Sequence, residues 1–167
     1  MAITQGIAAC FRFNNQAEQA VKFYTGIFKN SRIHKVVFNG VSAEQQGNNR
    51  NAVAIMFELN GQIFIAENTG VDSPFTDATY LQVMCHDQEE LDYFWESLSG
   101  GESERQEYGG KLRDQFGVAW QIIPDSLIDM IADENSDTSQ RALEAMRGMK
   151  KININELKRA YLGKNLH

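Results

Sequence analysis

Arg12 is the residue of the N-terminal part best suited to ligand chemistry, because it lies between Phe11 and Phe13 in an apolar segment. Side chains alternate between the two faces of a strand, so the two phenylalanines would face a core and Arg12 would point away from it, together with Cys10. A guanidinium on a half-open face is a good receptor for a carboxylate, phosphate or enolate. The alternative is a structural ion pair with an acid from the partner module or from a partner subunit.

A second apolar segment, TYLQVMC at residues 79–85, places Tyr80, Gln82 and Met84 on one face by the same alternation. The Gln82 amide could orient a carbonyl or hydroxyl group of a ligand, or it could hydrogen-bond within the sheet. Cys10 and Cys85 are isolated from each other and form neither a disulfide framework nor a zinc motif, so both are predicted to be buried and reduced.

None of the three histidines matches a catalytic motif. His86 is expected at the start of a helix, and His167 ends the chain. His34 is expected at the start of a strand, with no Ser, Cys or acidic motif near it. The histidines are therefore predicted not to be catalytic.

An internal repeat positions these residues. Residues 7–13 read as a strand, and Asn14-Asn15 is expected to cap a helix whose apolar residues recur at helical spacing. Residues 79–98 repeat this arrangement at an offset of about 71–72, with His86-Asp87 as the cap. Further strands are expected at 33–39, 52–59, 62–67, 101–108 and 118–123, with a hairpin turn at Asn60-Gly61.

The pattern predicts an α+β protein built from two βαβββ modules, at residues 4–70 and 77–124 of a single domain spanning 1–167. A helical C-terminal extension, 125–167, follows them. Its helices are expected from Asp125, from a cap at Ser136-Asp137, and from a cap at Asn153 or Asn155. A stripe of Met and Leu predicts that the extension packs on its own sheet or on a partner subunit.

Composition limits the classes of function. Hydrophobic residues make up 43% of the chain, enough for a sizeable core, and the net charge of −6 disfavours nucleic acid as a partner. No apolar run reaches the roughly 18–20 residues that cross a membrane, and Met1 to Phe11 lacks the basic start of a signal peptide. These features predict a globular protein without membrane or nucleic-acid partners, located in the cytoplasm.

Four segments carry a resemblance to a known family: FYTGIFKNSRI (23–33), DQEELDYFWESL (87–98), DQFGVAWQIIP (114–124) and EAMRGMKKININELKRAYLG (144–163). With them the chain resembles the PhnB-like branch of the vicinal oxygen chelate superfamily, which includes glyoxalases, bleomycin-resistance proteins and dioxygenases. Members of this branch often bear the label 3-demethylubiquinone-9 3-methyltransferase. The resemblance implies paired βαβββ modules around a cup-shaped small-molecule site, usually in a homodimer.

The methyltransferase label would require a nucleotide-type cofactor fold, and the chain has neither a GxGxxG motif nor an alternating β-α run. The resemblance also implies metal-ligand positions on the first and last strand of each module. They hold Ala8, Ile65, Tyr80 and Gln121, which are poor ligands for a divalent cation. Glu67 is a nearby carboxylate whose simplest role is that of an exposed residue at a strand end.

We therefore expect a small-molecule-binding protein of the vicinal oxygen chelate type without a metal or other cofactor, acting on a small metabolite of anionic or quinone-like character. Its expected ligand-binding residues are Cys10, Arg12, Glu67, Tyr80, Gln82, Met84 and Gln121. If it is an enzyme, Arg12, Tyr80 and Gln121 would polarise a substrate oxygen. The alternatives are a metal-dependent lyase, isomerase or dioxygenase that uses Glu67, and a homodimeric resistance protein that sequesters an antibiotic.

Overall fold

The computed structural model describes residues 6–38, 52–102 and 105–164, and its contacts divide the chain into two compact units. The first unit spans Met1–Pro74 and the second spans Phe75–His167. The boundary falls between the two expected modules. Each unit is described by itself.

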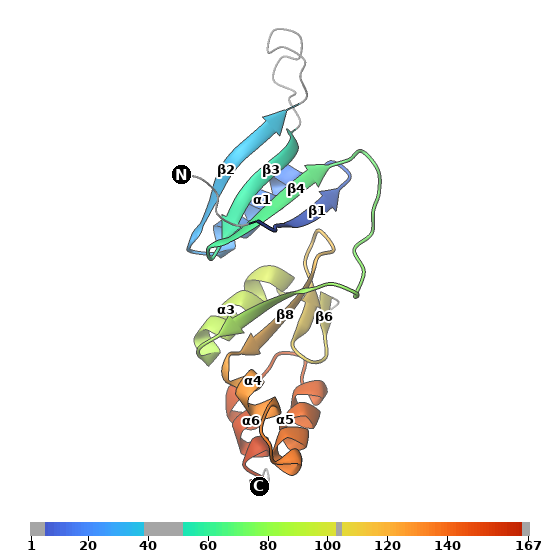
Figure 1. The fold of residues 1–167 in the computed structure, drawn as a ribbon. Coiled ribbons are helices and arrows are strands. Elements are labelled where there is room, and N and C mark those ends of the chain that lie inside the picture. The colour runs from blue at the N-terminus through green and yellow to red at the C-terminus, as the bar shows by residue number, and fades with distance from the viewer. Residues whose placement is uncertain (1–5, 39–51, 103–104, 165–167) are drawn as a thin grey trace. The chain divides into compact units, whose positions relative to one another are not determined.

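The first unit is one four-stranded sheet with a helix on one face (Figure 1). Its elements are β1 (Ala9–Phe13), α1 (Ala17–Ile27), β2 (Ser31–Phe38), β3 (Ala52–Leu59) and β4 (Gln62–Asn68). The strand order is β1-β4-β3-β2; β1 runs parallel to β4, and the other pairs are antiparallel. This is the βαβββ unit that the sequence predicted.

Stacked aromatic rings join α1 to the sheet. Tyr24 and Phe57 are fully buried and stack with ring centroids 6.4 Å apart, and Phe64 stacks on both Phe57 (5.6 Å) and Phe11 (5.5 Å). Packing of these rings stabilises the helix-facing side of the sheet, so the opposite side is left for other contacts.

The start of α1 differs from the prediction. The residue before the helix is Gln16, and neither Asn14 nor Asn15 caps it. Instead, the Asn68 side chain at the end of β4 accepts a hydrogen bond from the Ala17 backbone N–H at 2.9 Å. A side chain distant in the sequence therefore accepts a hydrogen bond from one of the free N–H groups at the start of α1. The predicted hairpin turn at Asn60-Gly61 is confirmed, since both residues have positive φ.

The second unit repeats the same topology. It contains β5 (Leu81–Cys85), α3 (Gln88–Ser99), β6 (Gln106–Glu107), β7 (Lys111–Arg113) and β8 (Ala119–Pro124), in the strand order β5-β8-β7-β6. Asp87 caps α3 as predicted, by accepting a hydrogen bond from the Glu90 N–H. Of the strand expected at 101–108, residues 103–104 lie outside the described residues, and among the described ones only Gln106–Glu107 form a strand, β6.

Gly109 and Gly110 form the turn between β6 and β7, and both have positive φ. A Cβ atom on Gly110 would lie 2.5 Å from the Ile122 carbonyl oxygen, so the turn requires glycine for space as well as for conformation.

The C-terminal extension forms three helices, α4 (Ser126–Ile131), α5 (Ser136–Gly148) and α6 (Ile154–Tyr161), at the red end of the chain in Figure 1. Asn153 caps α6 as predicted, whereas α5 is capped by Asn135 and not by Ser136-Asp137. Asn135 is one residue earlier, where its side chain can accept bonds from the first free N–H groups of the helix.

The segment between α5 and α6 is attached to the second sheet of the same chain. The N–H groups of Gly109 and Gly110 donate to the carbonyls of Met149 and Lys150, at 2.7 and 3.0 Å. Gln88 of α3 donates to the Ile152 carbonyl and accepts from the Ile154 N–H, and the Ile152 side chain is fully buried. The extension therefore packs on its own module.

Candidate functional site

The face of the first sheet opposite α1 carries Cys10, Arg12 and Glu67, three of the predicted site residues. Cys10 pairs with Ile65 and Arg12 with Glu67 across the parallel strands β1 and β4. The predicted alternation is confirmed on β1, because Phe11 and Phe13 are buried while Cys10 and Arg12 are exposed. Although Arg12 is in register with Glu67, it makes no salt bridge with any of the described residues.

The prediction that both cysteines are buried is wrong for Cys10 and right for Cys85. Cys10 is on the open face because of its position in the alternation. Partial burial raises the pKa of the Cys10 thiol, and the charge and hydrogen bond of Glu67 raise it further, while Arg12 lowers it. The thiol is therefore held in its protonated form beside the Glu67 carboxylate.

Beyond Cys10 and Arg12, this face has an apolar centre. Met56 of β3 pairs with Ile65 of β4, and both side chains are half-buried. A ligand lying here would meet a cation at the β1 side and hydrocarbon in the middle.

A cluster at the β2 side of the same face was missed from the sequence. Glu58 of β3 accepts hydrogen bonds on one oxygen, Oε2, from His34 Nε2 at 2.7 Å and from Arg32 Nε at 3.0 Å. The interpretation of His34 as having no acid nearby is therefore wrong. The hydrogen bond from His34, with help from Arg32, holds the pKa of Glu58 below its ordinary value.

The corresponding face of the second sheet carries Gln82 and Gln121, which bind each other. Gln82 Nε2 donates to Gln121 Oε1 at 2.7 Å, and Gln121 Nε2 donates to the Gly109 carbonyl at 2.8 Å. Gln121 is buried, so both ends of its amide are committed to the sheet. Of the two roles considered for these residues, the structure shows hydrogen bonding within the sheet. Met84 is 58% exposed on the same face.

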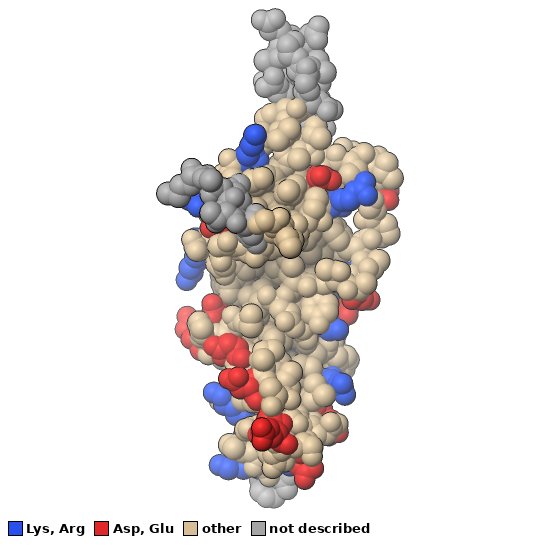
Figure 2. All heavy atoms as spheres, viewed as in Figure 1, with Lys and Arg blue, Asp and Glu red and all other residues tan. Residues whose placement is uncertain are grey.

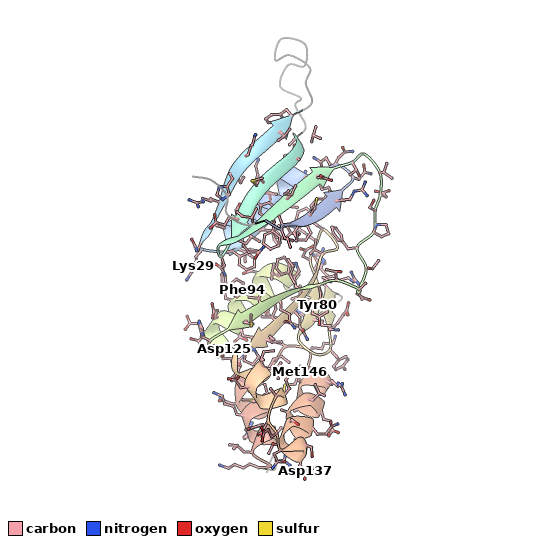
Figure 3. The ribbon with its side chains drawn as sticks, viewed as in Figure 1. Lys29, Tyr80, Phe94, Asp125, Asp137 and Met146 are labelled. Atoms are coloured by element: carbon pink, nitrogen blue, oxygen red, sulfur yellow. The ribbon has the colours of Figure 1, made fainter. Side chains whose placement is uncertain are left out.

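Tyr80 lies just before β5 in the second unit (Figure 3), and Lys111 Nζ is 5.2 Å from the centre of its ring. The two residues line a hollow of about 130 Å³ with Asp77, Glu107, Leu112, Ala119 and Trp120. Lys111 was missed as a site residue, although its register opposite Gln121 places it on the open face. Alternation in β7 is the signal that could have found it.

Charges elsewhere on the second unit are mixed. On the face shown in Figure 2, Lys and Arg lie among Asp and Glu. Lys151, for example, pairs with Asp92 and Glu96 at 3.1 and 3.7 Å.

The positions that carry metal ligands in the related metalloenzymes do not fit a divalent metal in this chain. The Gln121 oxygen already accepts a hydrogen bond, Tyr80 lies under a lysine, and Ala8 and Ile65 have no ligand atoms in their side chains. Among the residues that the structure describes, no three His, Cys, Asp or Glu side chains are grouped to hold a metal ion.

A family model and several solved structures match this chain and its fold. The family model described as 3-demethylubiquinone-9 3-methyltransferase matches residues 5–123. A PhnB protein from Bacillus cereus that carries the same methyltransferase name is 28% identical with a TM-score of 0.58; the match covers 71% of this chain and 99% of that one. No match was found among curated proteins.

Two more distant structures share the fold. A protein from Pseudomonas aeruginosa is 14% identical with a TM-score of 0.57, and the match covers 72% of this chain and 98% of that one. The fosfomycin resistance protein FosX from Mesorhizobium loti is 13% identical with a TM-score of 0.51, covering 79% and 100%. Within the described part of the chain, no helix is both long and apolar enough to cross a membrane. The match to the family model over most of the chain, together with the repeated βαβββ topology, shows that this chain belongs to the PhnB-like branch of the vicinal oxygen chelate superfamily.

Proposed function

We propose that the protein binds a small, partly apolar anion on the open face of its first sheet, and that it does so without a metal ion at the family's ligand positions. The observation that carries the proposal is the placement of Arg12. Arg12 is exposed on the face that also carries the half-buried Ile65 and Met56, and although it is in register with Glu67 it makes no salt bridge with the described residues. A guanidinium placed in this way can hold a carboxylate or phosphonate through two hydrogen bonds.

The hollow beside Tyr80 in the second unit adds less to this proposal. Its cation, Lys111, lies over the Tyr80 ring, but the carboxylates of Asp77 and Glu107 also line the hollow and disfavour an anion there. Gln82 and Gln121 form the floor of the open face of the second sheet and hold each other in place.

Methyl transfer and metal-dependent chemistry are less well supported. Both described sheets belong to βαβββ modules, and neither is the doubly wound sheet that binds a nucleotide-type cofactor. Glu67, the carboxylate considered as a metal ligand, instead interacts with the Cys10 thiol.

The test is a binding screen with small anions, using phosphonoacetate, 4-hydroxybenzoate and pyruvate as probes. Arg12→Ala should weaken binding of the anions that bind by about ten- to a hundredfold, since a charge-assisted contact contributes roughly 1.5–3 kcal/mol. Arg12→Lys should recover only part of this loss because an ammonium lacks the planar fork. Calorimetry measures the affinities, and elemental analysis of protein purified without chelators measures metal content.

Two results would contradict the proposal. Unchanged affinity of Arg12→Ala for every anion that binds would show that Arg12 is not the receptor. One zinc, nickel or manganese ion per chain, lost in a Glu67→Gln variant, would show a metal site.

We also propose that the protein is a homodimer. The edge strand β2 exposes the apolar side chains Ile33, Val36, Val37 and Phe38, which are 37–45% accessible. An exposed apolar edge strand favours pairing or burial against a second subunit.

A further inference from the structure

The His34–Glu58–Arg32 cluster on the first sheet has the geometry of an oriented base. Glu58 Oε2 lies 2.7 Å from His34 Nε2 and 3.0 Å from Arg32 Nη2. The Glu58 side chain is 14% accessible and that of His34 is 23% accessible, while Arg32 is 64% accessible. The Glu58 carboxylate is thus largely covered, and its two hydrogen-bond donors, His34 and Arg32, are more accessible than it is.

The carboxylate fixes which nitrogen of His34 carries the proton. An ionised carboxylate can only accept hydrogen bonds, so the His34 nitrogen that contacts it, Nε2, is the protonated one. In the neutral ring Nδ1 is then left with its lone pair. Nδ1 has no hydrogen-bond partner among the described residues.

A bulge in β2 explains why His34 can reach Glu58. Arg32 pairs directly with Glu58, and the register shifts between Ile33 and Lys35, so that His34 has no partner residue in β3. Bulges redirect side chains from the regular alternation of a strand. Lys35 follows His34 directly on β2 and Arg32 precedes it by two residues, while Glu58 faces it from β3.

These charges favour an anionic substrate. With neutral His34, the positive Arg32 balances the negative Glu58 within the cluster, and Lys35, the residue after His34 in β2, adds one positive charge to this strand. Glu58 is already paired, which leaves the outer side of the Arg32 guanidinium to attract a carboxylate.

We propose that His34 is a general base that removes a proton from a carbon next to the carbonyl of a small 2-oxo carboxylate or a similar anionic carbon acid. This inference rests on the proposed binding of small anions to this face. The proton passes from carbon to His34 Nδ1, and the electron pair of the broken C–H bond forms the enolate. Glu58 stabilises the imidazolium, and Arg32 holds the carboxylate at the β2 edge of the sheet, a position separate from that of Arg12 on β1 at the opposite edge. The proton on Nδ1 exchanges with water, and transfer of a solvent-derived proton from Nδ1 to the enolate carbon re-forms the C–H bond and the neutral ring, so the exchange needs no reactant other than water.

Hydrogen–deuterium exchange of the pyruvate methyl group in D₂O, followed by proton NMR, tests this step directly. Wild-type protein should accelerate the exchange, and His34→Gln should reduce the acceleration by about a hundredfold or more, the range for loss of general-base catalysis. His86→Gln is a matched control, because His86 also contacts a carboxylate, Asp125, at 2.6 Å but is 85% accessible and lies in the other unit. The His86→Gln variant should accelerate exchange of the pyruvate methyl protons as much as the wild type does.

A second measurement does not depend on any ligand. Nitrogen-15 NMR of the imidazole side chains at pH 8 should show His34 protonated at Nε2 in the wild type. Glu58→Ala should lose this single tautomer and slow the pyruvate exchange, while its remaining spectrum should show an intact fold. Glu58 is thereby tested as a positioning residue.

The outcomes separate the inference from the proposed function. If pyruvate binds the wild type and binds Arg12→Ala more weakly, but exchanges equally fast with His34→Gln, the base is wrong and the binding function stands. Protonation of His34 at Nδ1 in the wild type also overturns the inference, whatever binds. Failure of every probe to bind contradicts the proposed function, and absence of exchange then contradicts the inference as well.

Discussion

Replacing Asp114 with alanine should destabilise the second unit strongly. Asp114 is only 3% exposed, and its carboxylate accepts hydrogen bonds from the N–H groups of Phe116 and Val118 and, at 2.8 Å, from the indole Nε1 of Trp120. It thus organises the turn that leads into β8, the central strand that carries Gln121. Alanine provides no acceptor for any of these donors.

The size of the effect follows from which donors stay buried. Phe116 is half-buried, so water can reach its N–H, whereas Val118 and Trp120 are 3% and 2% exposed. Each buried donor left without an acceptor costs roughly 1–3 kcal/mol, so the free energy of unfolding should fall by about 2–6 kcal/mol. With a denaturant slope of about 2 kcal/mol per molar urea, the unfolding midpoint should fall by about 1–3 M.

Tryptophan fluorescence during urea unfolding measures this change, because Trp95 and Trp120 are both buried in the second unit. Asp77→Ala is the control, since Asp77 is 79% exposed and its ion pair with Arg113 should contribute little. A midpoint for Asp114→Ala within experimental error of the wild type would refute the reasoning.

Two further predictions concern the first unit. The raised pKa of Cys10 means less thiolate at pH 8, so iodoacetamide should modify Cys10 more slowly than a cysteine in a short peptide. Glu67→Gln should speed this reaction. Equal rates for the wild type and Glu67→Gln would contradict the effect of Glu67 on the Cys10 pKa. Cys85, which is buried with its pKa raised to about 12, should stay unmodified. Light scattering of the wild type should give twice the chain mass of 18.9 kDa, and a monomeric wild type would contradict the dimer. Val37→Lys in β2 should raise the monomer fraction. Val71→Lys, at an exposed position outside the strands, is the control and should not change it.

Local patterns were sufficient to predict the repeat and the alternating faces. The exposed Arg12 between buried Phe11 and Phe13 followed from a period of two residues, and the Asn60-Gly61 hairpin followed from turn chemistry. These features depend on neighbours in the chain. The order of strands and helices in the two βαβββ modules could therefore be predicted from the sequence, whereas two helix caps and the length of β6 could not.

Contacts between distant segments could not be predicted in the same way. The group that satisfies the start of α1 is Asn68, which is 51 residues from its partner Ala17. His34 and Glu58 are 24 residues apart and meet only because β2 shifts register after Ile33. A bulge is not visible in the alternation of hydrophobic residues, so the acid beside His34 was missed.

The attachment of residues 149–152 to the Gly109-Gly110 turn makes the two copies of the repeat unequal as building blocks. The first copy completes its sheet with its own long strands, whereas the short β6 and β7 of the second share a turn with the C-terminal extension. Gly109 donates its N–H to Met149 and accepts on its carbonyl from Gln121, so the open face of the sheet and the extension meet at one residue. In a protein assembled by recombination, the first module could be exchanged alone, but the second would have to move together with its three helices.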